Sequence, residues 1–149
     1  MDPHEQLMGF FSITNKINDF YTHLALQSGL SESEHWTLYF IRQSLGPCTS
    51  KSVCDQWSLR KQTVHSALKA LQKKGLITLN VLEEDRRSKE ILLTPEGVSF
   101  AETYLDPIFA AEKSAFMRME ESTRCALIKG SKEYLTKLRA NLEEQKKRE

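Results

Sequence analysis

Apolar residues recur at helical spacing over the first 45 positions and predict two helices. The first begins with Asp2 as N-cap, Pro3 at the first helical position and Glu5 three residues beyond the cap, a combination typical of a helix start. It ends at Gly29, where a left-handed residue is tolerated. The second helix covers about residues 31–45, because the sequence Ser-Glu-Ser-Glu at its start has the spacing of a capping box and Gly-Pro follows its end.

The middle of the chain predicts a helix-turn-helix followed by a β-hairpin. Two short helices are expected at about 49–57 and 59–74, and Gly75 is placed to end the second in a left-handed conformation. Apolar and polar residues then alternate over 77–81 and again over 91–93, as in half-buried strands. The charged residues between these two strands form the tip of the hairpin.

Two further helical stretches follow the hairpin. Thr94 and Pro95 are suited to open the first of them, and Pro107 is expected to kink or break it. The second begins near Glu120, and its charged tail, residues 143–149, is expected to fray. The predicted fold class is therefore mainly α with a small β-hairpin wing.

Charge is unevenly distributed along the chain. The formal net charge of the 149 residues is +1, which is too small for a general polycation. From Gln56 to Leu82 there is no Asp or Glu, and the same window contains five basic residues. The rest of the chain then carries a net charge of −4. This asymmetry indicates a local surface for an anionic partner.

The sequence lacks the motifs of enzymes, metal sites, membrane spans and exported proteins. Its cysteines, Cys48, Cys54 and Cys125, form no CxxC pair, and the last two are expected to be buried inside helices as reduced thiols. The four histidines have no ligand spacing, and no nucleophile is placed beside a histidine. There is no signal peptide and no run of 18 apolar residues. We therefore expect a cytoplasmic protein that is not an enzyme and needs no cofactor.

The predicted helix over 59–74 has one apolar face and one face of DNA-binding residue types. Val64, Leu68 and Leu71 face inward. Glutamine can bond to adenine, arginine or lysine to guanine, and a threonine methyl group can contact that of thymine. The alternatives are an ordinary solvated helix face and a different helix start, with Ser58 as its cap. The residues expected to contact DNA from this helix are Arg60, Lys61, Gln62, Thr63, His65, Ser66 and Lys69.

The hairpin tip carries more charge than a turn needs, since seven of the eight residues from Glu83 to Glu90 are charged. An arginine at such a tip can enter the minor groove of A·T-rich DNA, and we assign this role to Arg87. Asp85 is close enough across a turn to orient the guanidinium group. Arg86 and Lys89 would contact phosphates or solvent. The alternative is a solvated turn without a partner.

Four short motifs lie between residues 63 and 97. They are Thr63-Val64, Leu71-x-Lys73-Lys74-Gly75-Leu76, Asp85-x-Arg87 and Leu93-Thr94-x-x-Gly97. Together they resemble the MarR family of bacterial winged-helix transcriptional regulators. Each motif alone is weakly specific, whereas their combined spacing is specific. The flanking helices fit the layout of the family, so the resemblance covers nearly the whole chain.

The resemblance implies a homodimer in which the first helix and the last two helices of each subunit interlock. Residues 1–30 and 98–149 would then be dimerisation helices, and 31–97 the winged helix-turn-helix lobe. Each subunit would offer one recognition helix and one wing to half of a pseudo-palindromic operator. Many members repress transcription and release DNA when a small molecule or an oxidant changes the spacing of the two lobes. The base-facing residues implied by the family match are Lys61, Gln62, Thr63, His65 and Ser66.

Several alternatives remain open. The family often binds phenolic ligands between its lobes, and Tyr21, His23, His35 and Trp36 lie near that junction, although such residues can equally form plain core. No cysteine precedes Cys48, so thiol sensing is not favoured. The terminal helices can pack as an intramolecular bundle instead of a dimer. The main alternative function is a winged-helix module that binds an acidic protein instead of DNA.

Overall fold

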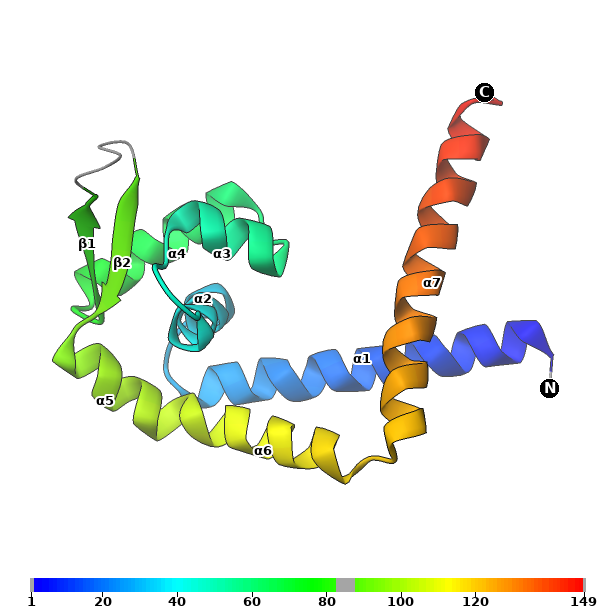
Figure 1. The fold of residues 1–149 in the computed structure, drawn as a ribbon, viewed down its shortest axis with the longest axis horizontal. Helices are drawn as coiled ribbons and strands as arrows, with labels where there is room; N and C mark the ends of the chain where they lie inside the picture. The colour runs from blue at the N-terminus through cyan, green and yellow to red at the C-terminus, as the bar shows by residue number, and fades with distance from the viewer. Residues whose placement is uncertain (1, 83–87, 149) are drawn as a thin grey trace. The chain divides into compact units, whose positions relative to one another are not determined.

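The computed structural model describes residues 2–82 and 88–148, which form seven helices and two strands (Figure 1). The predicted class, mainly α with a small β-hairpin, is confirmed. Within the described ranges, none of the helices combines the length and apolar character that a membrane crossing requires. In chain order the elements are α1 (Pro3–Gln27), α2 (Glu32–Gln43), α3 (Ser50–Trp57), α4 (Lys61–Lys73), β1 (Ile77–Val81), β2 (Lys89–Leu93), α5 (Pro95–Tyr104), α6 (Asp106–Arg118) and α7 (Glu121–Lys146).

The core of the helix-turn-helix lies between α2, α3 and α4. Val64, Leu68 and Leu71 of α4 are buried, as the sequence predicts. α2 packs against α4 and contributes Leu38, while α3 contributes Val53. These aliphatic side chains hold α4 by its inner face, so its outer face stays open to a partner.

The hairpin is joined to the start of α3. β1 and β2 pair antiparallel along all five residues of each strand. Ile77 and Ile91 are buried as predicted, whereas Val81 is 57% exposed because it lies at the tip end, away from the lobe. The backbone N–H of Ile91 donates to the carbonyl oxygen of Cys48 at 2.7 Å. This bond fixes the hairpin to the segment that leads into α3.

Local capping signals predicted most helix starts. Ser31 and Glu34 form the predicted capping box, and the Thr94 hydroxyl accepts the N–H of Gly97 at 3.0 Å. The prediction for α1 is wrong in one respect. The helix begins at Pro3, but the Asp2 side chain makes no capping hydrogen bond. The free backbone N–H groups of the exposed first turn can donate hydrogen bonds to water instead.

Pro107 separates two helices, as the sequence predicts. α5 ends at Tyr104 and α6 begins at Asp106. The chain divides into two compact units at this point, residues 1–106 and 107–149. The expected fraying from residue 143 is wrong for residues 143–146, which continue α7. The N–H of Lys147 still donates to the carbonyl oxygen of Glu143 at 3.3 Å.

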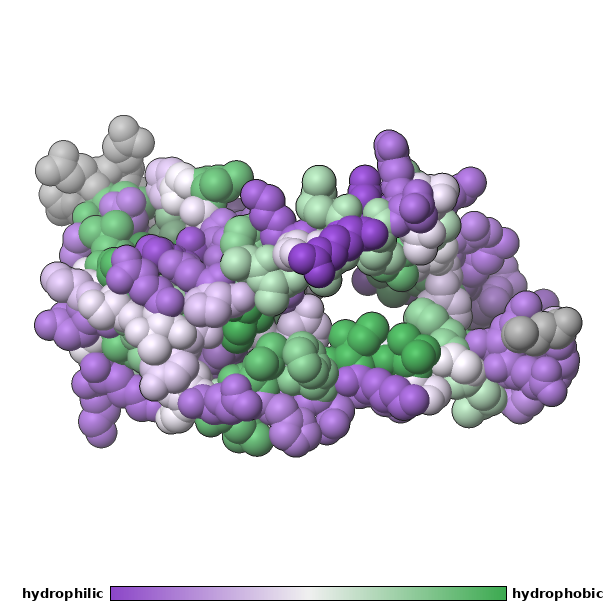
Figure 2. Space-filling view, turned by 90° about the horizontal axis from the view of Figure 1, so that it is seen from below, coloured by the Kyte–Doolittle hydropathy of each residue, from purple (hydrophilic) through white to green (hydrophobic). Residues whose placement is uncertain are grey.

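Large apolar side chains remain exposed along α1, α6 and α7, and Figure 2 shows hydrophobic side chains open on the surface. Soluble monomers rarely leave long apolar stripes uncovered. On α1 these residues are Leu7, Met8, Phe10, Phe11, Ile13, Ile17, Phe20 and Leu26. On α6 and α7 they are Phe109, Phe116, Met117, Leu127, Ile128, Tyr134, Leu135, Leu138 and Leu142.

Candidate nucleic-acid interface

The outer face of α4 carries exposed polar side chains. The apolar residues on its inner face are buried, so the buried apolar face and the exposed polar face of α4 are distinct, as the sequence predicts. The predicted contact residues on or beside α4 that are exposed are Arg60, Lys61, Gln62, Thr63, His65, Ser66 and Lys69. Since residues 56–82 contain no acid, a phosphate backbone approaching this face meets no repulsion from that segment.

The turn before α4 determines which residue begins this helix. Arg60 is the N-cap, so Lys61 is the first helical residue. The Arg60 side chain makes no capping hydrogen bond. Ser58 is not the cap of α4, because it ends α3 in the left-handed conformation with φ 53°. Trp57 supports the turn by stacking on Phe40, with 4.2 Å between ring centroids. Without a side-chain cap, the first N–H groups of α4 can donate to a phosphate.

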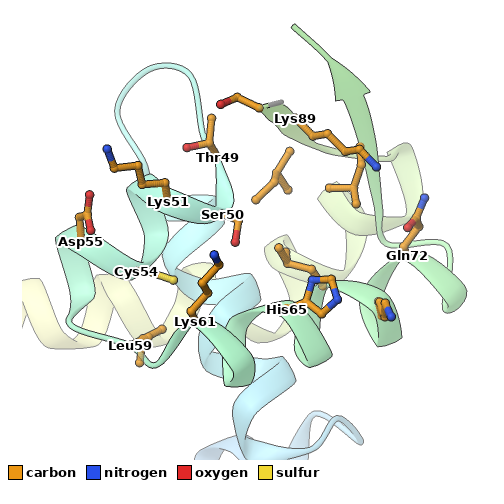
Figure 3. A pocket seen from close by; sticks show the side chains of 15 residues that line it. Thr49, Ser50, Lys51, Cys54, Asp55, Leu59, Lys61, His65, Gln72 and Lys89 are labelled. Atoms are coloured by element: carbon orange, nitrogen blue, oxygen red, sulfur yellow. The ribbon is translucent and has the colours of Figure 1, made fainter. Parts of the chain in front are cut away.

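A cavity of about 780 Å³ opens between α3, α4 and the hairpin (Figure 3). It is lined by Lys61, His65 and Lys69 of α4 and by Lys89 of β2. The structure therefore brings four of the predicted DNA-binding residues to one concave surface. In Figure 3 the Lys61 side chain extends towards the start of α3. The cavity is also lined by residues that the sequence did not predict as contacts, although a Thr-Ser-Lys run at a helix start was an available signal. They are Thr49, Ser50, Lys51, Gln72 and Ser88.

The stem of the wing is described, and its tip is not. The N–H of Leu82 donates to the carbonyl oxygen of Ser88 at 3.2 Å, and Lys89 is exposed beside this pair. Asp85, Arg86 and Arg87 lie outside the described residues. The minor-groove role of Arg87 and the orienting role of Asp85 therefore stay predictions.

Two ion pairs join α2 to other elements. The carboxylate of Glu34 accepts from the Lys74 ammonium group at the end of α4. Arg42 forms a two-pronged pair with Asp106, with Nε–Oδ1 at 3.0 Å and Nη2–Oδ2 at 2.7 Å. The hydrogen bond from Arg42 lowers the pKa of Asp106, against a smaller opposing effect of burial. α2 is thereby connected both to the recognition helix and to the start of α6.

The four residues predicted for an effector pocket lie in different surroundings. Tyr21, His35 and Trp36 gather in edge-to-face contacts, with centroids 5.2 Å apart for Tyr21–Trp36 and 4.6 Å for His35–Trp36. His35 is completely buried, and burial lowers the pKa of its imidazole. His23 is exposed, and its Nδ1 lies 2.8 Å from the backbone oxygen of Asp19 on the same helix. An effector site around these residues stays a prediction.

The three cysteines differ in exposure. Cys48 is buried, and burial raises the pKa of its thiol. Cys54 is half-buried and lines the cavity beside α4. Cys125 is exposed, so the expectation that it is buried is wrong: its position inside a helix does not cover it, because α7 presents it to solvent. In the described part of the chain no three His, Cys, Asp or Glu side chains group as metal ligands.

The helix-turn-helix and the hairpin wing define the winged-helix fold, in which α4 presents a basic outer face. Residues 28–88 match the family model described as the MarR family. The winged-helix segment of this chain is therefore similar to the MarR family over these residues. Among curated proteins no match is found.

Solved structures of similar fold cover most of the chain. The MarR family regulator NMB1585 from Neisseria meningitidis has a TM-score of 0.69 and 23% identity, over 97% of this chain and 99% of that one. The S. aureus MepR–DNA complex has a TM-score of 0.65 and 21% identity, over 87% and 94% of the two chains. Bordetella bronchiseptica BpsR, whose DNA binding is regulated by 6-hydroxynicotinic acid, has a TM-score of 0.61 and 18% identity, over 83% and 90%. These likenesses establish the fold.

Proposed function

We propose that this protein binds a pseudo-palindromic operator as a homodimer and represses transcription from it. The recognition helix α4 lies in the major groove and reads bases, and Arg87 at the wing tip enters the adjacent minor groove. An aromatic or anionic effector releases the DNA. The alternative, a module for an acidic protein partner, lacks an observation that favours it over DNA.

One observation carries this proposal. Residues 56–82 contain no acid, and they include α4, whose exposed outer face lies next to Lys89 in the stem of the hairpin. Lys61, Lys69 and Lys89 suit phosphates or guanine, while Gln62 and Thr63 suit adenine and thymine. A solvated helix face needs polarity but does not need the exclusion of acids over 27 residues, counted from 56 to 82. The absence of acids from residues 56–82 therefore favours a polyanion of regular shape, such as duplex DNA, as the binding partner.

The homodimer is supported by the apolar stripes on α1, α6 and α7. Burying such stripes against a second copy would stabilise the association by the hydrophobic effect. A two-fold axis would also duplicate the recognition helix and match a palindromic site. MepR, to which this chain is similar, was solved in complex with DNA, and the DNA binding of BpsR is regulated by 6-hydroxynicotinic acid. Both relatives support the partner and effector classes proposed here.

Substitution in α4 tests the reading of bases. Gln62→Ala should weaken binding to the operator by about tenfold and leave binding to random DNA unchanged, because a lost base contact costs ~1–3 kcal/mol. Lys69→Ala should weaken both by a similar factor, since a phosphate contact carries no sequence information. Equal losses for both DNAs in the Gln62 variant would contradict a base-reading role.

Substitution in the wing tests the minor-groove contact. Arg87→Ala should weaken operator binding by about tenfold or more, which corresponds to ~1.4 kcal/mol or more. Arg139→Ala makes the same chemical change on α7 and should have little effect on DNA affinity. Thermal unfolding of both variants would show that they fold. Unchanged affinity of a folded Arg87 variant would remove the wing from the proposal.

A further inference from the structure

The C-terminal end of α4 is bonded to one oxygen atom of α2. Oε2 of Glu34 accepts a hydrogen bond from the Lys74 ammonium group. The same oxygen accepts the backbone N–H of Ser31 at 3.3 Å, which closes the capping box of α2. The Glu34 side chain is 13% exposed, against 43% for Lys74. The capping box therefore fixes the carboxylate, and the ion pair fixes the end of α4 to it.

α2 lies between α1 and α4 and is also bonded to α1 at this end (Figure 1). The Thr22 hydroxyl of α1 donates to Oε1 of Glu32 at 3.1 Å. Nδ1 of His35 lies 2.9 Å from the hydroxyl of Ser28, the C-cap residue of α1. These two contacts flank Glu34 in the sequence. Its carboxylate therefore belongs to a junction of α1 and α2 that is held on both sides.

The ion pair lies at the opposite end of α4 from the residues proposed to read bases. Gln62 and Thr63 are in the first turn of the helix. At about 1.5 Å per residue, Lys74 lies roughly 18 Å further along the helix than Gln62. The buried aliphatic side chains between these ends hold α4 by the hydrophobic effect, which is not directional. A shift of the C-terminal end would therefore change the angle of α4 and move its first turn relative to the bases.

The ion pair also separates Lys74 from the cations that can bind phosphate. Lys61 and Lys69 line the cavity between α3, α4 and the hairpin, and Lys74 does not. The charge of Lys74 is balanced by the nearly covered carboxylate of Glu34. A lysine that contacts no phosphate releases no counterion from DNA, so its loss leaves the salt dependence of binding unchanged.

We propose that Glu34 and Lys74 are positioning residues for base reading. They fix the angle at which the first turn of α4 meets the bases, and neither contacts DNA. This inference rests on the function proposed above, in which α4 reads a DNA sequence, whereas the ion pair itself does not. Loss of the pair lowers affinity for the specific site and leaves affinity for other DNA unchanged.

Two lysine variants separate positioning from phosphate binding. Fluorescence anisotropy would measure affinity for DNA from upstream of the protein's own gene and for a shuffled fragment of equal composition. Lys74→Gln should weaken binding to the upstream fragment about fivefold, which is ~1 kcal/mol, and leave both the shuffled fragment and the salt slope unchanged. Lys69→Gln should weaken binding to both fragments and reduce the salt slope by ~0.9. A Lys74→Gln variant that behaves like Lys69→Gln, or like the wild type, would overturn the positioning role.

Two controls share features of the Lys74→Gln variant. Lys74→Arg keeps the positive charge and the donor, and it should retain the preference for the upstream fragment. Lys73→Gln removes a charge from the neighbouring exposed position, where it has a similar interaction with the helix dipole, and it should retain the preference as well. A lost preference in either control would show that the pair with Glu34 is not the cause.

Glu34→Gln tests the acceptor of the pair. Glutamine keeps a side-chain oxygen for the Ser31 N–H but has no charge for Lys74. It should reduce the preference for the upstream fragment by the same factor as Lys74→Gln. The double variant should lose no more than either single variant, because all three remove one interaction. Losses that add in the double variant would contradict a shared role.

Amide hydrogen exchange in the DNA-free protein tests the ion pair separately. The N–H of Lys74 donates to the carbonyl oxygen of Ala70, and that of Gly75 to the carbonyl oxygen of Gln72, both at 3.0 Å. Both amides should exchange about threefold faster in Glu34→Gln, as expected for a partly exposed pair. Unchanged exchange would overturn the inference. Faster exchange in the variant, with equal wild-type affinity for the two DNA fragments, would refute the proposed function and leave the ion pair standing.

Discussion

At the scale of single residues, Gly97 determines how closely α5 approaches the end of the recognition helix. A Cβ atom at this position would lie 1.9 Å from the backbone oxygen of Leu76. The same segment is held by the Thr94 hydroxyl, which donates to the carbonyl oxygen of Gly75 at 2.6 Å and accepts the N–H of Gly97. The glycine of the Leu93-Thr94-x-x-Gly97 motif is therefore required by space.

Replacing this glycine is expected to destabilise the fold. Gly97→Ala should lower the free energy of unfolding by about 1–3 kcal/mol or more, because the backbone of residue 76 has to move. Ser99→Ala, on an exposed position of the same helix, should change it by less than about 0.5 kcal/mol. Denaturant unfolding of the two variants measures the difference, and similar stabilities would contradict the close approach.

Only one of the two ring nitrogens of His35 makes a hydrogen bond among the described residues. Its Nδ1 lies 2.9 Å from the Ser28 hydroxyl, which itself donates to the carbonyl oxygen of Ala25. The imidazole must then be the donor at Nδ1, and Nε2 is an unprotonated buried atom with no partner among the described residues. A second proton would place a charge in the core without an acceptor, so burial lowers the pKa of His35.

The lowered pKa predicts a loss of stability in acid. The unfolded chain takes up a proton near pH 6.5, whereas folded His35 does so only at lower pH. The free energy of unfolding should therefore fall by up to ~1.4 kcal/mol per pH unit below that value, until the folded pKa is reached. His35→Gln should remove this component and the exposed His65→Gln should retain it. Equal slopes in both variants would contradict the buried neutral imidazole.

At the scale of elements, the capping signals were predictable because they are local. The capping box at Ser31 and the cap at Thr94 each depend on residues three positions apart. The break between α5 and α6 depends on one residue, Pro107. The alternation of Val64, Leu68 and Leu71 with exposed polar residues likewise follows from helical periodicity. The helix α4 could therefore be predicted from the sequence, although its first residue could not.

What sequence could not predict depends on distant elements meeting. The cavity beside α4 requires the hairpin, which begins after Gly75, to lie against α3. Ser58 ends α3 in the left-handed conformation, although serine, unlike glycine, does not mark such a position in the sequence. The exposure of Cys125 depends on what covers α7, and helical position is no guide to that.

The Arg42–Asp106 pair is predicted to hold the junction of α5 and α6. In a double-mutant cycle, Arg42→Gln and Asp106→Asn should show a measurable coupling of ~0.2–1 kcal/mol, limited because both side chains are partly exposed to solvent. Since the pKa of Asp106 is lowered, the coupling is present at neutral pH and lost as the pH falls through the folded value. Amide hydrogen exchange should rise at Leu105 in the single variants. Additive effects would contradict the pair.

At the scale of the whole molecule, the apolar stripes predict a dimer. Sedimentation should show a species of twice 17.2 kDa, and Leu138→Glu on α7 should shift it towards the monomer. Leu45→Glu makes the same change at a fully exposed loop residue outside these helices and should leave the dimer intact. A wild-type protein that sediments only as a monomer would favour an intramolecular bundle instead.

The most direct measurement compares two DNAs. Fluorescence anisotropy would follow binding to DNA from upstream of the protein's own gene and to a shuffled fragment of equal composition. We predict that the upstream DNA binds ~10³-fold tighter at physiological salt, with log K falling by ~0.9 per log salt for each phosphate contact. Equal affinity for the two fragments would contradict the central claim that α4 reads a sequence.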